Sequence, residues 1–190
     1  NGYDCIVPLS GGRDSTFVLH FVKNELNLNP LTYTYDWSMV TDLARRNISR
    51  ICSRLKVENI IRAADISKKR KYIKKNVAAW LKNPDLGMIP IFMAGDKYFF
   101  YYTQQLMKQT NIKLNIWGIN RFEDTYFKSG FAGAKPNFSK DAIFSLSNTN
   151  KLALSTFFLK SIFKNPSYLN SSFFNNLGGH ISRLMHPNEG

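Results

Sequence analysis

Short apolar runs and helix-spaced apolar positions follow one another along the first two thirds of the chain. The run Cys5–Leu9 and the β-formers of Leu31–Tyr35 are typical of buried strands. Ala44, Ile48, Cys52 and Leu55 recur with the spacing of one helix face. The complete pattern predicts strands at 5–9, 31–35, about 60–61 and 114–117, and helices at 15–26, 44–55, 73–81 and 99–106.

Such alternation predicts an α/β fold, with a doubly wound, mostly parallel sheet joined by right-handed crossovers. Ligands of these sheets bind beyond the carboxyl ends of the strands, where the strand order reverses. Three polar clusters are expected at those ends: Ser10–Ser15 after the first strand, Asp36 after the second and 118–124 after the fourth. We therefore expect them to converge on one site.

The alternation weakens beyond residue 136. The segment Leu152–Phe163 is apolar with flanking lysines, and Asn165–Pro166 interrupts it. We expect an α/β domain over 1–135, which contains the three polar clusters, and a helical appendage or interface segment over 136–190, with homo-oligomerisation through such an interface as one outcome. An amphipathic surface segment is the alternative for this tail.

Charge and cysteine content narrow the partners and the compartment. The 190 residues carry 26 Lys and Arg against 13 Asp and Glu, a net charge of +13, which favours an anionic partner such as RNA, acidic lipid or an anionic substrate. The basic stripe Arg46, Arg50 and Arg54 and the block Lys68–Lys71 are interpreted first as solvated helix faces. Cys5 and Cys52 lie in apolar surroundings with no CxxC pair, so zinc and disulfides are disfavoured and the cytoplasm is expected.

The ends of the chain bear on targeting. The first residues, NGYDC, do not resemble a signal peptide, and no run approaches the roughly 18 apolar residues of a transmembrane helix. Because no initiator Met is present, we interpret the sequence as cut from a longer chain.

The stretch Pro8–Thr16, PLSGGRDST, connects the first strand to the first helix. Such a loop presents backbone N–H groups at the positive end of a helix, where phosphate binds readily. Gly11 and Gly12 allow close approach, Ser10 and Ser15 supply hydroxyls, and Arg13 supplies positive charge. Asp14 fits an anion site if it binds a Mg²⁺ ion that bridges to phosphate oxygens.

The motif SGGRDS resembles the PP-loop of the ATP pyrophosphatase superfamily, which has an adenine nucleotide alpha-hydrolase-like, Rossmann-like fold. Members include NAD, GMP and asparagine synthases and tRNA-modifying ligases. The resemblance implies that ATP and Mg²⁺ bind, that AMP is transferred to a substrate carbonyl oxygen with release of pyrophosphate, and that a nucleophile then displaces AMP. Position 13, often lysine in relatives, is Arg13 here.

Residue roles follow from the same resemblance. Ser10, Gly11, Gly12 and Ser15 would hold the pyrophosphate part of ATP, with Arg13 and Asp14 as the catalytic pair and Asp14 as metal ligand. Asp36 would lie beside the adenosine, or else belong to a helix N-cap. Gly118 corresponds to the strand-end glycine, and Glu123, preferred over Asp124, to the second metal ligand. Lys128 and Lys135 are further phosphate candidates or surface lysines, and His20 is expected to be packed or to cap a helix.

Within the superfamily, YDCIVPLSGGRDST with WGIN and FEDTYFKSGFAG looks most like the N-acetyl sugar amidotransferases of bacterial surface-polysaccharide biosynthesis. That resemblance covers residues 3–135 and implies a nucleotide- or lipid-linked sugar, an acetamidino product, and a glutaminase subunit that supplies ammonia. The chain is shorter than such enzymes and lacks their cysteine-containing N-terminal segment. A tRNA-modifying ligase is the alternative, and a nucleotide-binding relative without catalysis is the third.

Overall fold

Three parallel strands carry the N-terminal part of the fold in a computed structural model that describes residues 2–37, 40–93, 98–118, 130–134 and 147–184. The strands are β1 (Cys5–Pro8), β2 (Pro30–Asp36) and β3 (Asn59–Ala63), in the order β1-β2-β3. Cys5 pairs with Pro30, and Thr32 with Asn59. The prediction of an α/β fold with a parallel sheet is confirmed, whereas three strands do not establish a doubly wound sheet.

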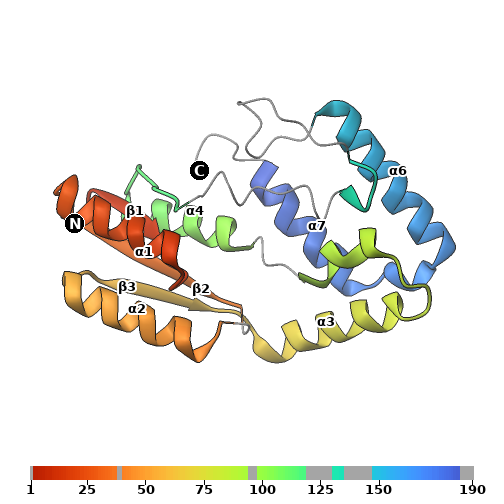
Figure 1. The fold of residues 1–190 in the computed structure, drawn as a ribbon, viewed down its shortest axis with the longest axis horizontal. Coiled ribbons are helices and arrows are strands. Elements are labelled where there is room, and N and C mark those ends of the chain that lie inside the picture. Colours follow the sequence, from red (N-terminus) through yellow and green to blue (C-terminus); the bar gives the residue numbers. More distant parts are fainter. Residues whose placement is uncertain (1, 38–39, 94–97, 119–129, 135–146, 185–190) are drawn as a thin grey trace. The chain divides into compact units, whose positions relative to one another are not determined.

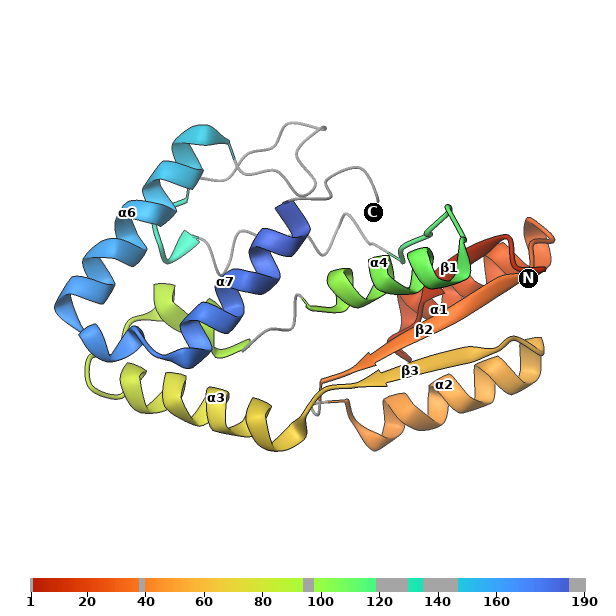
Figure 2. The ribbon, with the colours of Figure 1, turned by 180° about the vertical axis from the view of Figure 1, so that it is seen from behind.

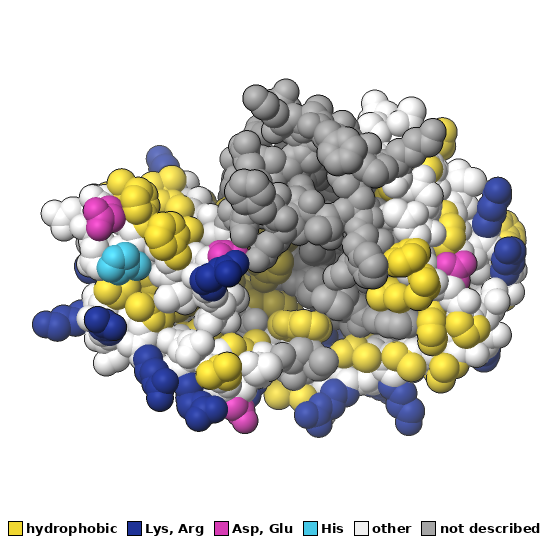
Figure 3. All heavy atoms as spheres, viewed as in Figure 1, with side chains coloured by type: hydrophobic (Ala, Val, Ile, Leu, Met, Phe, Trp, Pro, Cys, Tyr) yellow, Lys and Arg dark blue, Asp and Glu magenta, His cyan; other side chains and the backbone are white. Residues whose placement is uncertain are grey.

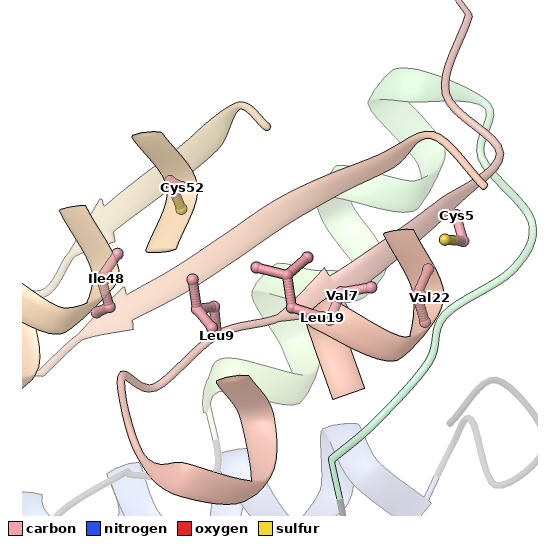
Figure 4. Packing of buried hydrophobic residues seen from close by; sticks show 7 residues of the cluster. All are labelled: Cys5, Val7, Leu9, Leu19, Val22, Ile48 and Cys52. Carbon is pink, nitrogen blue, oxygen red and sulfur yellow. The ribbon is translucent and has the colours of Figure 1, made fainter. Parts of the chain in front are cut away.

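Helices lie on both faces of this sheet (Figures 1 and 2). Successive side chains of β1 alternate between the faces, so Cys5, Val7 and Leu9 pack against α1 (Arg13–His20) and α2 (Asp42–Leu55). Figure 4 shows this cluster, in which Leu19 and Ile48 approach from the two helices. Residues of β1, β2 and α4 (Tyr98–Thr110) form the core on the opposite face: Ile6, Leu31, Tyr33 and Leu106, joined by Ile112, which follows α4.

The predicted fourth strand, 114–117, is not formed as a strand in the structure. Asn115 makes one isolated parallel bridge to Ile6, in which Ile6 N–H donates to Leu114 O and Ile116 N–H donates to Ile6 O, both at 2.9 Å. One bridge contributes too few ladder bonds to define a strand. It nevertheless places this segment beside β1, on the side away from β2, so the order of the chain reverses at β1.

The predicted helix at 15–26 is also corrected. α1 begins at Arg13 and ends at His20, and the chain continues as a π-helix, η1 (Phe21–Glu25). In η1 the N–H of Leu26 donates to Phe21 O at 3.0 Å, a bond five residues long. The wider turn changes which residues share a face, so helical periodicity counted from the sequence fails beyond His20.

The chain divides into two compact units that do not follow the predicted boundary at 135/136. The sheet unit holds β1–β3, α1, α2 and α4; the helical unit holds most of α3 (Ile66–Trp80), η2 (Leu86–Met93), α6 (Asn148–Lys164), η4 (Pro166–Tyr168) and the first part of α7 (Ser171–Leu184). α3 joins the tail because Ala79, Met88 and Tyr168 form one buried cluster. Within the described residues no helix is long and apolar enough to cross a bilayer.

Candidate functional site

The loop Ser10–Ser15 leaves the carboxyl end of β1 and becomes the first turn of α1. Leu9 N–H donates to Tyr33 O at 2.7 Å, and Thr34 Oγ1 donates to Leu9 O at 2.7 Å, so β2 holds the last residue before the loop. The loop therefore starts from a fixed point of the sheet.

Two serines close the loop on itself. Ser10 Oγ and Ser15 Oγ lie 3.0 Å apart, and Ser10 N–H donates to Ser15 Oγ at 3.2 Å. Ser15 Oγ donates to Gly12 O at 3.3 Å, and Gly12 N–H donates to Ser10 Oγ at 3.3 Å. Outside the loop, Asn47 Nδ2 of α2 donates to Gly11 O at 3.2 Å. These bonds fix the loop without using the N–H groups of the first turn of α1 that follow it.

Gly11 is required at its position for two reasons. Its φ of +77° belongs to the left-handed region that favours glycine, and a Cβ there would collide with the backbone carbonyl of Ala44. The first turn of α2 thus packs directly on the loop backbone.

Gly12 is the N-cap of α1, so no N-cap side chain accepts a hydrogen bond from the backbone N–H groups in the first turn of this helix. A helix start of this kind presents donors and the positive end of the helix dipole to an anion. The side chain of Asp14 is 31% exposed beside these donors, and its Oδ1 accepts from Arg13 Nε at 3.2 Å. Arg13 itself is 81% exposed, so it extends outward from the loop.

The structure brings Gly118 to the loop. A Cβ on Gly118 would lie 2.8 Å from Ser15 Cα and 3.1 Å from the Asp14 carbonyl carbon, too close for any side chain. The predicted strand-end glycine thus contacts the predicted phosphate loop, across 103 residues of sequence. The close approach occurs beside β1, where the strand order reverses, which is where α/β sheets bind ligands.

Asp36 ends β2 and is held by an ion pair. Its Oδ2 accepts from Arg45 Nη2 at 2.9 Å, and the bond raises the pKa of Arg45. The N-cap of α2 is Thr41, whose Oγ1 accepts from Ala44 N–H at 3.2 Å, so the N-cap alternative for Asp36 is wrong. Asp36 is thereby placed at the same edge of the sheet as the loop, with its charge already balanced.

Several predicted site residues lie outside the described residues: Glu123, Asp124, Lys128 and Lys135. Among the described residues no group of three His, Cys, Asp or Glu side chains could hold a metal ion. The described part of the site thus offers one carboxylate for Mg²⁺, that of Asp14, together with the Ser10 and Ser15 hydroxyls. This set fits a cation that is bound mainly through phosphate oxygens and water.

The two cysteines are buried and free. Burial raises the pKa of the Cys5 thiol to about 11 and also raises that of Cys52. Thiols of this kind are poor nucleophiles at neutral pH, because the thiolate is the reactive form. Neither cysteine therefore suits the sulfur transfer of tRNA-thiolating enzymes.

Sequence reasoning missed two polar groups beside Gly118. The side-chain amide of Asn115 and the indole N–H of Trp117 are buried, with no hydrogen-bond partner among the described residues. Both lie on the segment that leads to Gly118, and Trp117 packs against Phe99 of α4 with ring centroids 5.2 Å apart. An apolar run is the only signal for this segment in the sequence, and it does not indicate unpaired polar atoms.

No family model matches the chain, and no curated protein matches it.

Proposed function

We propose that the chain is an ATP-dependent amidotransferase of the PP-loop type, built on a doubly wound, Rossmann-like sheet. The observation that carries the proposal is the loop Ser10–Ser15 at the reversal of strand order, where Gly11 packs against α2, Gly118 packs against Ser15, and Gly12 is exposed. A loop that ends in an uncapped helix start is suited to the phosphates of a nucleotide.

The residues of the loop have distinct parts in this reaction. Backbone N–H groups of the α1 start and the Ser10 and Ser15 hydroxyls would bind the β- and γ-phosphates that leave as pyrophosphate. Asp14, with Glu123 as the resemblance implies, would hold Mg²⁺, which neutralises the phosphate oxygens when bound. Arg13 would add positive charge at the outer side of the loop.

The proposed acceptor is the acetamido group of a nucleotide- or lipid-linked sugar. The acetamido oxygen attacks the α-phosphorus of ATP, the bond to the β-phosphate oxygen breaks, and pyrophosphate leaves. Ammonia, supplied by a glutaminase subunit, adds to the activated carbon. AMP then departs with the former acetamido oxygen, and the product is an acetamidino sugar.

The test is release of pyrophosphate from Mg-ATP, measured with ammonia and a UDP-linked N-acetyl sugar. We expect Asp14→Ala to abolish release while circular dichroism stays unchanged, because the Asp14 side chain is partly exposed and supports no buried contact. Glu25→Ala, an exposed acid at the end of η1, is the matched control and should keep full activity. Unchanged turnover in Asp14→Ala would exclude Asp14 as a metal ligand and overturn the proposal.

A further inference from the structure

A groove of about 620 Å³ lies between α1 and α2, on the outer side of the sheet unit. It begins at Gly11 and Gly12 of the loop and continues past Phe17 and His20 of α1 and Arg50 and Arg54 of α2. Its volume is within the range of pockets for small molecules. The groove adjoins the loop, and Gly118 is not among its lining residues.

Every titratable side chain that lines the groove is basic: Arg13, His20, Arg50 and Arg54. Arg50 and Arg54 are one helical turn apart, and like charges at this spacing destabilise a helix. Within the part of the chain that the structure describes, no hydrogen bond or ion pair engages either of them. The surface of the unit shows Lys and Arg side chains beside hydrophobic ones (Figure 3).

Two neighbouring arginines of α2 are engaged elsewhere. Arg45 pairs with Asp36 and Asp42, at 2.9 and 3.3 Å. Arg46 Nε donates to Asp42 O at 3.4 Å, and Arg46 does not line the groove. All three arginines of the predicted stripe Arg46, Arg50 and Arg54 are exposed, as expected for a solvated face, and two of them line a groove that has no acidic side chain among its lining residues.

The groove also contains an exposed aromatic ring. Phe17 is 65% exposed and stacks on Phe21, with ring centroids 6.3 Å apart. His20, which the sequence predicts to be packed or to cap a helix, is exposed, and its Nδ1 bonds to Asn24 Nδ2 at 2.9 Å. A flat ring beside guanidinium groups suits a base with its phosphates, since bases stack on aromatic side chains and guanidinium groups bind phosphate.

We propose that this groove binds a nucleoside diphosphate, the carrier part of the acceptor substrate, with its phosphates on Arg50 and Arg54 and its base on Phe17. The identification of the ligand with the acceptor rests on the proposed function. Because the groove reaches Gly11 and Gly12, a ligand bound there touches the loop from outside. The phosphates of the acceptor would thus lie beside those of ATP, with Gly11 and Gly12 common to both sites.

The experiment is calorimetric titration of the full chain with UDP, CDP and GDP in turn, with Mg²⁺ and α,β-methylene-ATP present to fill the loop. We expect one of the three diphosphates to bind. Arg50→Ala and Arg54→Ala should each weaken that binding about 10-fold or more, as for a lost charge-assisted hydrogen bond. Phe17→Ala should weaken it about 10-fold, and Phe17→Trp should retain it.

Arg46→Ala is the matched control on the same helix and should leave the affinity unchanged. Equal weakening by Arg46→Ala, no binding of any of the three diphosphates, or equal binding of farnesyl diphosphate would overturn the proposal. Salt-sensitive RNA binding that the diphosphates do not displace would also overturn it and indicate a nucleic-acid surface.

Asp14→Ala separates this proposal from the proposed function. The variant should bind the diphosphate normally, because Asp14 does not line the groove. Diphosphate binding that depends on Arg50, in a protein that releases no pyrophosphate, would leave the groove established and remove the amidotransferase function.

Discussion

Different kinds of contact stabilise the interior of each of the two units. The sheet unit has an apolar cluster on each face of its strands, with Cys5, Ile6 and Leu19 fully buried. The helical unit has a small cluster around Met88 and Tyr168. Its elements are also joined by short polar bonds: Asn165 Nδ2 to Ala79 O at 2.6 Å, Asn76 Nδ2 to Ser172 Oγ at 2.8 Å, and Lys82 Nζ to Ser167 Oγ at 2.6 Å.

The two units also differ in how far their apolar side chains are buried. The strands of the sheet unit are covered by helices, so alternate side chains are buried on both faces. In the helical unit, α6 directs Leu152, Leu159 and Phe163 outward, with exposures of 70, 58 and 84%. Directional polar bonds, rather than apolar burial alone, then define how its helices meet.

The largest expected effect comes from truncating the two cores. Leu19→Ala removes a fully buried side chain from the sheet unit and should lower the free energy of unfolding by about 3–4 kcal/mol. Met88→Ala should cost less, about 2 kcal/mol, because the surroundings of a small cluster relax more easily. Urea denaturation measures both values. A larger loss for Met88→Ala would show that the helical unit depends on its apolar cluster as strongly as the sheet unit does.

Two glycine substitutions test how tightly the backbone is packed in each unit. Gly11→Ala in the sheet unit introduces a Cβ against the Ala44 carbonyl at a φ of +77° and should cost about 2–3 kcal/mol. Gly130→Ala in the helical unit meets nothing within 4 Å and should change the free energy by less than about 0.5 kcal/mol. Thermal unfolding by circular dichroism compares them. Equal tolerance at both positions would mean that the loop is not held against α2.

Much of the sheet unit could be predicted from the sequence, because its signals are local. β1 and β2 are continuous apolar or β-forming runs, and α2 has helical spacing from Ala44 to Leu55. The residue types of the loop Ser10–Ser15 indicate a phosphate site by themselves, and its place directly after a strand determines its position in the fold. The place of Gly118 after the fourth predicted strand, together with the resemblance, predicts it at this site, but no local pattern indicates that it contacts Ser15.

The helical unit was harder to predict because its contacts are polar and distant in sequence. The spacing of Ile73, Val77, Trp80 and Leu81 predicts one buried face of a helix at 73–81. Val77 is nevertheless 36% exposed, and Leu81, which follows the end of α3, is 64% exposed. Asn76 and Ala79 are buried instead, because Asn76 bonds to Ser172 and Asn165 bonds to Ala79. The spacing of apolar residues does not reveal a buried helix face on which the central side chain is a hydrogen-bonded asparagine.

The burial of a basic residue in the sheet unit is likewise not predicted by the sequence pattern. The block Lys68–Lys71 is predicted to be solvated, yet Lys69 is only 7% exposed and its Nζ lies 5.3 Å from the ring centroid of Tyr98. The aromatic face stabilises the ammonium group in place of water. Such a pairing depends on α4 packing near the start of α3, which the sequence of either helix does not reveal.

The buried amide of Asn76 tests the polar character of the helical unit. Asn76→Ala leaves Ser172 Oγ and Asn170 Nδ2 without this partner and should cost about 2 kcal/mol. Asn83→Ala, at an exposed turn residue, is the control and should change the free energy by less than about 0.5 kcal/mol. Urea denaturation measures both values. A negligible loss at Asn76 would remove the distinction between the two units.

The smallest effect is expected at the most exposed apolar side chain of α6. Phe163 is 84% exposed, so unfolding uncovers little more of it, and Phe163→Ser should change the free energy of unfolding by less than about 0.5 kcal/mol. Phe157→Ser, by contrast, removes a ring that packs on the Met88 cluster and should cost about 3 kcal/mol.

Measuring the stability of Phe163→Ser at several protein concentrations shows whether the Phe163 ring is covered in solution. If Phe163→Ser lowers the stability by more than 1 kcal/mol, its ring is covered in solution, because an exposed ring contributes almost nothing to the free energy of unfolding. A loss that grows with protein concentration would indicate that a second copy covers the ring, since association stabilises the folded form by mass action. A loss independent of concentration would indicate that another part of the same chain covers it. Either result would revise the view that this face of α6 is exposed.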